Sequence, residues 1–283
     1  MKKVVSVALA LCMAAAVTGC AGEPAAAEST APESSSAAES TAEEAPAEEA
    51  AEEPAEEAAE EPAAEVAVMS YDEYMAAATD EAVAIEAYVQ AKQSYYAEQG
   101  TATVYLQDQD GGYFAYDMAC TQEDYDAMTE GTKIQVSGYK AEWSGEIEIM
   151  DGKLDEILTD DTYVAEPVDM TELLGTDELE AHQNEKVSFT GLTVEPSTDA
   201  EGNEVAFLYN YDGSGTDGDD LYFNVGYNGA TYSFVIESYL CDNTTEVYNA
   251  VKNLEVGQTI DCEGFLYWYE GANPHITSVT VTG

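Results

Sequence analysis

Aromatic side chains are the groups in this sequence best suited to hold a ligand. The chain contains 20 Tyr, 6 Phe and 2 Trp, and the faces of such rings stack on sugars, bases and cations. We expect one stacking platform from Trp143 with Tyr105 and Tyr113, and a second from Trp268 with its flanking tyrosines. The residues predicted to contact a ligand are Tyr105, Tyr113, Trp143, Tyr222, Tyr267, Trp268 and Tyr269.

The alternative to a binding role is ordinary packing. Tyrosine packs well on the half-buried surface of a sheet, so each tyrosine has a structural explanation as well as a functional one. Trp143 has the same alternative, because a tryptophan next to a tight turn can serve as a core residue that closes one end of a β-structure.

Oxygen ligands for a metal are concentrated in the stretch 211–220. A flexible loop with several carboxylates suits a hard cation such as Ca²⁺, and a weak Ca²⁺ site is predicted at Asp212, Asp217, Asp219 and Asp220. The spacing is not that of an EF-hand, because Asp217 stands where glycine is required. The alternative is a solvated insertion in a hairpin. No other cofactor is expected.

No arrangement of residues in the sequence indicates catalysis. The two histidines, His182 and His275, lie near the ends of predicted segments, and no nucleophile motif surrounds either of them. We therefore expect both to be ordinary surface or turn residues. Carboxylates are so abundant that no pair stands out as an acid and a base. The sequence predicts a protein that is not an enzyme.

The elements that would position these residues are short strands interrupted by a short helix. After a helix capped by Ser70, alternating apolar residues predict strands separated by glycine-containing turns. Thr121 is the predicted cap of the short helix, and Gly131 ends it. The predicted strands cover residues 83–89, 101–107, 113–118, 132–139 and the region of Ile147 and Ile149, before a linker at 151–161.

The same plan recurs in the second half of the chain. The pattern G-x-x-I-x-x-x-G begins at Gly131 and again at Gly257, a cysteine precedes the helix in both halves, and a tryptophan follows the second glycine of the pattern in both. Landmarks repeated in the same order indicate a repeated structural unit. The predicted strands are 186–195, 204–210, 221–225, 231–236, 258–267 and 276–281, and the predicted helix is 243–254.

A helix between strands three and four of a five-stranded unit is the plan of an OB-fold barrel. The segments T-V-Y-L-Q-D-Q-D-G-G-Y-F-A-Y-D-M-A-C and G-Y-K-A-E-W-S-G-E-I-E-I resemble OB-like domains of uncharacterised bacterial lipoproteins. The predicted fold is mainly β, with two five-stranded OB-like antiparallel barrels behind a disordered N-terminal tether. OB barrels meet ligands on strands two and three and on the loops between strands one and two and strands four and five.

The N-terminus indicates a lipid anchor. Lys2 and Lys3 precede a short apolar run, and Val17-Thr18-Gly19-Cys20 resembles a bacterial lipobox in which Cys20 is acylated. An ordinary secretory signal with a chance cysteine is the alternative. We expect a signal peptide at 1–20, a disordered Ala/Glu/Pro tether at 21–68, and barrels at 69–168 and 169–283. The expected location is the extracytoplasmic face of a bacterial cell membrane.

The charge of the chain restricts its partners. The sequence holds 58 Asp and Glu against 8 Lys, has no Arg, and carries a formal charge of -50. Nucleic-acid affinity comes largely from cations that neutralise phosphates, so no nucleic-acid partner is expected. Neutral glycans, peptides and cationic ligands fit the composition better. The predicted function is capture of an extracellular ligand or envelope protein through aromatic faces, and the alternative is a structural or assembly lipoprotein that acts through protein contacts.

Overall fold

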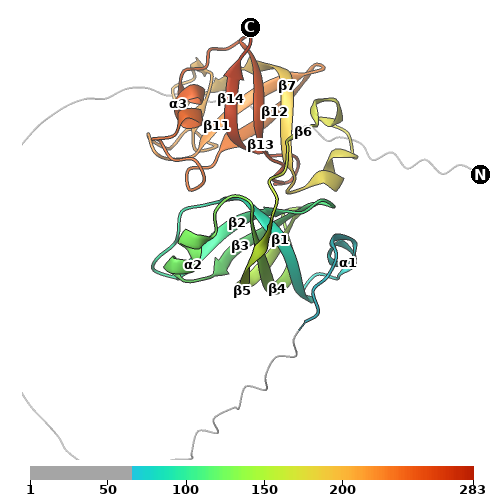
Figure 1. The fold of residues 1–283 in the computed structure, drawn as a ribbon. Helices are drawn as coiled ribbons and strands as arrows, with labels where there is room; N and C mark the ends of the chain where they lie inside the picture. The colour runs from blue at the N-terminus through green and yellow to red at the C-terminus, as the bar shows by residue number, and fades with distance from the viewer. Residues whose placement is uncertain (1–65) are drawn as a thin grey trace, which may run out of the picture. The chain divides into compact units, whose positions relative to one another are not determined.

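The computed structural model describes residues 66–283, without the side chain of Asp160, and shows two β-barrels within one compact unit of the chain (Figure 1). The predicted signal peptide, the acylated Cys20 and the tether up to residue 65 lie outside the described residues. The first part of the chain contains α1 (Tyr71–Ala76), β1 (Ala82–Lys92), β2 (Thr101–Gln107), β3 (Gly112–Ala119), α2 (Gln122–Ala127), β4 (Thr132–Trp143) and β5 (Glu146–Thr162).

The second part of the chain begins with the edge strand β6 and two turns of 3₁₀ helix. Its elements are β6 (Val168–Asp169), η1 (Thr171–Leu173), η2 (Leu179–His182), β7 (Lys186–Glu195), β8 (Ser197–Thr198), β9 (Glu204–Val205), β10 (Leu208–Tyr209), β11 (Leu221–Tyr227), β12 (Ala230–Ile236), α3 (Glu246–Lys252), β13 (Thr259–Phe265) and β14 (His275–Val281). The predicted boundary between residues 168 and 169 falls inside β6, which pairs with β7.

The first barrel closes in the order β1-β2-β3-β5-β4, with β4 returning to β1. The neighbouring strands are antiparallel except for β3 and β5, which run parallel with Ala115 opposite Ile149. The second barrel repeats this ring with β7, β11, β12, β14 and β13, and its parallel pair is β12 with β14. Helices α2 and α3 stand between the third and fourth strands of their barrels. The predicted pair of OB-like barrels is confirmed.

The helices begin where polar caps predict. Ser70 and Thr121 each form a capping box with the residue three positions later, so two backbone donors are satisfied at each helix start. Thr245 caps α3 with its side chain alone, which accepts a hydrogen bond from the Tyr248 amide without a capping box, and this helix is shorter than the predicted span 243–254. Among residues 66–283 no helix is long and apolar enough to cross a membrane.

The repeated glycine pattern has a physical cause at each of its three fixed positions. Gly131 and Gly257 follow the helices at φ values of +83° and +90°, where a side chain would strain the backbone. The isoleucines three residues later are fully buried. The second glycines, Gly138 and Gly264, lie at irregular points of the strand ladder, and a Cβ at Gly264 would stand 2.2 Å from the His275 carbonyl oxygen.

Two predicted boundaries differ from the structure. The predicted linker 151–161 belongs to β5, because Asp151 takes a positive φ and the strand continues past it with a shifted register. The predicted strand 204–210 is not a barrel strand. It yields only β9 and β10, two-residue strands beside a loop rich in Gly and Asp, and the second strand of the barrel is β11.

Each barrel has its own apolar core, and a third cluster lies between them. Val104 and Leu106 of β2 belong to the core of the first barrel, whereas Tyr105 between them belongs to a separate cluster with Phe114 and Phe265. Alternate residues of a strand point to opposite faces, so Tyr105 points out of its barrel. Cys120, Cys241 and Cys262 are free thiols, and the last two are buried, as expected of small apolar residues.

Two similar glycine substitutions should have unequal effects on stability. Gly264→Ala should lower the free energy of unfolding by roughly 3 kcal/mol, because its Cβ would overlap the backbone of β14. Gly257→Ala should cost about 1 kcal/mol, since it adds backbone strain but meets no neighbouring atom within 4 Å. Urea unfolding of both variants measures the difference. Equal losses would show that the strand contact at Gly264 is not as tight as described.

Candidate functional site at the seam between the barrels

The barrels meet through aromatic rings on their outer faces. Tyr105 of β2 stacks on Phe265 of β13 with ring centroids 4.6 Å apart, and Phe114 of β3 lies 5.4 Å from Tyr267. We call this region the seam. It includes the aromatic contact, His275 and the segment 144–147, which is hydrogen-bonded to the second barrel. The strand two and three face of the first barrel, where OB folds commonly bind ligands, is therefore covered by the second barrel at Tyr105 and Phe114.

His275 lies inside the seam and not at the surface. Its Nδ1 is 2.5 Å from the hydroxyl oxygen of Tyr105, and its ring stacks on Tyr267 at 4.2 Å. Burial lowers the pKa of His275 to about 3, so the imidazole is neutral at physiological pH. The expectation that His275 is an ordinary surface or turn residue is wrong, because the outer face of β14 is covered by the first barrel.

The segment 144–147, at the turn between β4 and β5, is held by backbone and amide hydrogen bonds from the second barrel. The Glu270 amide donates to the Ser144 carbonyl at 2.8 Å, and the Gln183 side chain donates to the Gly145 carbonyl at 2.9 Å. Gly145 has no room for a side chain, since a Cβ there would stand 2.8 Å from the Trp268 ring. These contacts fix the turn of the first barrel against the loop after β13.

Glu146 is a fully buried carboxyl at the centre of the seam. Its Oε2 accepts a hydrogen bond from the Trp268 amide at 2.8 Å, but no donor among residues 66–283 reaches Oε1, nor the Oδ1 of the buried Asn184. Burial raises the pKa of Glu146 to about 8, although the Trp268 amide and the Asn184 side chain oppose this shift. The protonated carboxyl carries an O–H that can supply the missing donor to Asn184.

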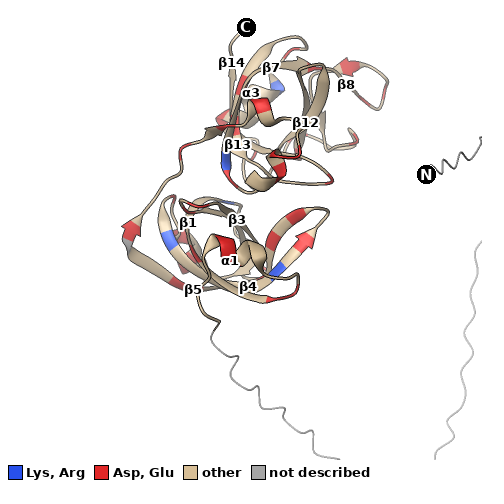
Figure 2. Cartoon of the chain, turned by 90° about the vertical axis from the view of Figure 1, so that its right-hand side faces the viewer, with Lys and Arg blue, Asp and Glu red and all other residues tan. Residues whose placement is uncertain are grey.

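Two further carboxyls near the seam share this character. Burial raises the pKa of Glu148 to about 7, and burial together with the charge of Asp220 raises the pKa of Glu237 to about 7. Glu237 accepts a hydrogen bond from the Leu240 amide, whereas no donor among the described residues reaches Glu148. Asp and Glu are spread over both barrels while Lys is scarce (Figure 2), so these carboxyls have few cations to pair with.

Two aromatic rings lie side by side at the solvent-facing edge of the seam. Trp143 and Tyr269 are 52% and 48% exposed, and their ring centroids are 5.1 Å apart at an interplanar angle of 40°. We call them the ring pair. They come from equivalent positions, because each follows the second glycine of the repeated pattern at the turn between strands four and five of its barrel.

The structure gathers five of the seven predicted ligand-contacting residues in this region. Tyr267 and Trp268 directly precede Tyr269 in the chain, and Tyr222 is close enough to Tyr269 for that phenol to contribute to the raised pKa of Tyr222. Tyr222 also has burial, Asp220 and Glu237 raising its pKa, to about 12. The predicted second platform around Trp268 therefore shares its rings with the first barrel.

Tyr105 and Tyr113 do not join the ring pair. Tyr105 is enclosed in the seam, and Tyr113 is enclosed between Tyr71 and Tyr74 with its hydroxyl donating to Asp108. The predicted platform of Trp143, Tyr105 and Tyr113 does not form. The second barrel covers Tyr105 and α1 covers Tyr113, and nothing in the sequence indicated that either ring is covered. Sequence reasoning also missed Glu146 and Glu148, whose alternation with Ile147 and Ile149 indicated an outward face and gave no sign that this face is covered.

The predicted metal-binding aspartates point to separate partners. Asp217 pairs with Lys252 and accepts from Asn243, Asp219 accepts from the Thr216 amide, and Asp220 accepts from Ser238. Asp212 accepts from the Ser214 amide at the exposed tip of the loop. Within residues 66–283 no group of three or more His, Cys, Asp or Glu side chains could hold a metal ion. The four aspartates do not converge on a Ca²⁺ site.

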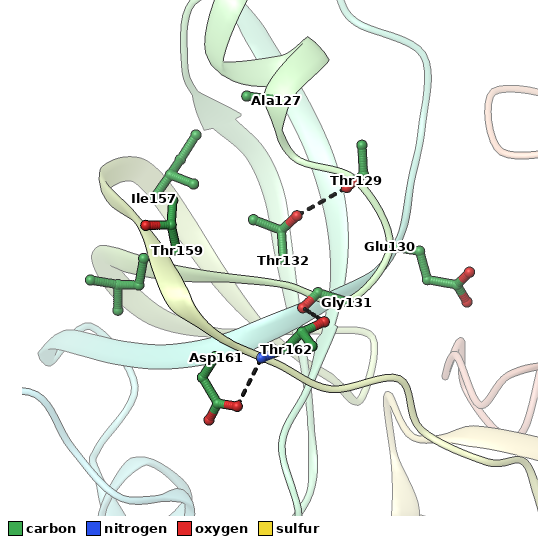
Figure 3. A pocket seen from close by; sticks show the side chains of 10 residues that line it. Ala127, Thr129, Glu130, Gly131, Thr132, Ile157, Thr159, Asp161 and Thr162 are labelled. Carbon is green, nitrogen blue, oxygen red and sulfur yellow. Dashed lines mark hydrogen bonds between the residues drawn. The ribbon is translucent and has the colours of Figure 1, made fainter.

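A pocket lies elsewhere, between the end of α2 and β5 of the first barrel (Figure 3). Four threonines line part of its wall, with Thr129 bonded to Thr132 and Thr162 donating to the Gly131 carbonyl. It has no aromatic ring and no carboxyl with a raised pKa, so it lacks the chemistry concentrated at the seam. Its lining is Ala127, Thr129, Glu130, Gly131, Thr132, Ile157, Leu158, Thr159, Asp161 and Thr162.

No protein-family model matches the chain, and no curated protein matches it. Solved structures do match in fold. The tetrameric p202 HIN2 domain matches 73% of this chain and 98% of its own at 12% identity and a TM-score of 0.28. The Ifi202 HINa domain in complex with 20bp dsDNA matches 71% and 98% at 12% identity and a TM-score of 0.32. The replication protein A heterotrimer bound to ssDNA matches 71% and 49% at 14% identity and a TM-score of 0.29.

These matches correct one prediction. The prediction that nucleic acid is not a partner rests on charge alone and is wrong, because two of the similar structures are complexes with DNA. At such low identity and TM-score the likeness concerns the arrangement of the strands, and it assigns no ligand to this chain.

The buried carboxyls predict how stability depends on pH. Between about pH 6.5 and 8.5 the unfolded chain holds Glu146, Glu148 and Glu237 ionised, while the folded chain keeps protons on them until their raised pKa values are passed. The folded state therefore binds more protons, and stability should fall as pH rises through this window. His275 opposes the trend only near pH 6.5, where the unfolded imidazole is still about half protonated, and it is neutral in both states above about pH 7.5.

Glu146→Gln should keep the seam and make this decline shallower, because the neutral amide replaces the protonated carboxyl. Urea unfolding midpoints at pH 6.5, 7.5 and 8.5 measure the slope. Glu123→Gln, an exposed substitution on α2, should leave the slope unchanged and is the matched control. A wild-type midpoint that rises with pH across this window would contradict the protonation of the seam.

Proposed function

We propose that this protein is a lipid-anchored binding protein that holds a ligand at the ring pair without transforming it. The observation that carries the proposal is the position of Trp143 and Tyr269, two half-exposed rings contributed by equivalent turns of two barrels. Exposed neighbouring aromatics at a fixed spacing are typical of sites that stack on a ligand.

Rigidity beneath the ring pair supports the proposal. Trp143 ends β4 and Tyr269 follows Trp268, so both rings stand on backbone that is bonded across the seam. A site whose rings are already placed loses less side-chain freedom when a ligand arrives. The hydrogen bond between Glu270 and Ser144 lies next to both rings and holds the two turns together.

The composition favours glycans, peptides or proteins with neutral or basic groups as ligands. A formal charge of -50 attracts basic partners. A single ring pair gives modest affinity, since each stacking contact contributes about 1–3 kcal/mol. A structural or assembly role in the cell envelope is the competing proposal, and it makes no use of exposed rings at a fixed spacing.

Trp143→Ala should reduce ligand binding at least tenfold while shifting the melting temperature by less than about 2 °C, because the ring is half exposed. Labelled full-length protein on an array of glycans, peptides and nucleic acids identifies the bound class, and the variant is tested on the same array. Tyr96→Ala is the matched control, since Tyr96 is 44% exposed on the connection between β1 and β2.

Two outcomes would count against a ligand site. If Trp143→Ala and Tyr96→Ala bind every arrayed compound as the wild type does, the ring pair is not where ligands bind. If Trp143→Ala lowers the melting temperature by many degrees, the tryptophan is a core residue of the turn and its exposure is secondary.

Cys20→Ala tests the proposed anchor, which lies outside the described residues. The variant should move from the membrane fraction to the soluble extracytoplasmic fraction, because the acylated thiol is the only anchor that the proposal requires. Cell fractionation followed by immunoblotting measures the shift. Wild type and variant in the same fraction would show that Cys20 does not anchor the protein.

A further inference from the structure

Glu148 is a buried carboxyl group without a positively charged partner among the described residues. It is 5% exposed, and among residues 66–283 no hydrogen-bond donor and no lysine reaches it. A buried carboxylate without such a partner is unfavourable unless it takes up a proton or meets a cation. When Glu148 is ionised, its negative charge is therefore not balanced by a cation or a hydrogen-bond donor of the described barrels.

The surroundings of Glu148 are aromatic. In the hairpin of β4 and β5 its cross-strand neighbour is the small Ala141, and Trp143 stands at the diagonal position on the same face. Ala115 of β3 lies opposite Ile149 of β5, so Phe114 and Tyr116 lie on the same face of the sheet as Glu148. The Phe114 ring centroid is 6.5 Å from that of Tyr116 and 5.4 Å from that of Tyr267. Burial is the main cause of the raised pKa of both phenols, and the charge of Glu148 also contributes to it. Tyr116 and Trp143 are both exposed to solvent.

The chain pairs ammonium groups with tyrosine rings elsewhere. The ammonium nitrogens lie 3.8 to 5.8 Å from ring centroids in four pairs, Lys92 with Tyr125, Lys133 with Tyr88, Lys140 with Tyr74 and Lys252 with Tyr248. The remaining described lysines, Lys153 and Lys186, contact Asp155 and Glu130. Beside Glu148 there are aromatic rings and a carboxylate, as in these pairs, but none of the described lysines contacts them.

We propose that the seam binds an ammonium group of a ligand, primary or quaternary, between Glu148 and the rings of Trp143, Tyr116 and Tyr267. Rings attract cations through their negative faces, the carboxylate supplies the counter-charge, and the excess of Asp and Glu over Lys in both barrels (Figure 2) attracts cations to the protein. This inference rests on the proposed function and narrows it to a chemical class.

Binding of an ammonium group should displace a proton. Burial raises the pKa of Glu148 to about 7, so the free site is partly protonated near neutral pH, and a bound cation favours the ionised form. The titratable groups that interact electrostatically with Glu148 are Glu146 on β5, Tyr116 on β3, Tyr267 after β13 and Tyr74 on α1. The tyrosines stay neutral throughout this range because their pKa values are raised further above 10.

The test compares choline with 3,3-dimethylbutan-1-ol, which has the same shape and no charge. Titration calorimetry on the full-length protein should show choline binding at least tenfold tighter than the alcohol. Affinity should rise between pH 6 and 8, with proton release seen as a dependence of the heat on the ionisation enthalpy of the buffer. Glu148→Gln should weaken choline binding about tenfold and make the pH dependence shallower, leaving only the part due to Glu146, whereas Glu123→Gln should change neither.

Equal binding of choline and the alcohol to the wild-type protein would overturn the inference, and this comparison needs no variant to fold. Equal loss of choline affinity in Glu148→Gln and Glu123→Gln would also overturn it, because net charge and not the site would then be responsible. If the arrayed ligands whose binding is lost in Trp143→Ala carry no positive charge, the ligand is not an ammonium compound, and the proposed function still holds. Choline binding that needs Glu148, with arrayed ligands indifferent to Trp143, would refute the proposed function alone.

Discussion

The stacking of Tyr105 on Phe265 is the contact on which the rest of this structure depends. It buries the outer face of one barrel against another, and burying an aromatic side chain of this size is worth roughly 1.5–3 kcal/mol. Once the faces meet, the turn at residues 144–147 is brought against the loop after β13. That juxtaposition places Trp143 beside Tyr269 and encloses Glu146, so the ring pair and the buried carboxyls have one common cause.

The same contact buries acidic side chains together with apolar ones. Glu146 and Glu148 alternate with core isoleucines on β5, and their side chains would be solvated if the barrel stood alone. Covered by the second barrel, they lose solvent and gain few donors, which favours the protonated form. A local arrangement that is poor for folding is expected where a protein binds something, and the proposed ammonium group is what would relieve this one.

The strands of the first barrel and most strands of the second could be predicted from the sequence because their causes are local, whereas the prediction of 204–210 as a barrel strand is wrong. Alternation, helix caps at Ser70 and Thr121, and the glycines of the repeated pattern each act within a few residues. The identity of the covered face could not be predicted, since alternation separates inside from outside but does not say which outside face meets another domain. For this reason Tyr105 and His275 were assigned to the surface, whereas Trp143 and Tyr269 were correctly placed at turns but not next to each other.

The most direct test of the account is whether the ring pair exists in solution. Nuclear Overhauser effects between the ring protons of Trp143 and Tyr269 should be observed in the full-length protein, since their centroids are 5.1 Å apart. The same spectrum should show contacts between Tyr105 and Phe265, whose centroids are 4.6 Å apart. Assigned rings with contacts inside each barrel and none between the barrels would contradict the account, because no seam would then hold the two turns together.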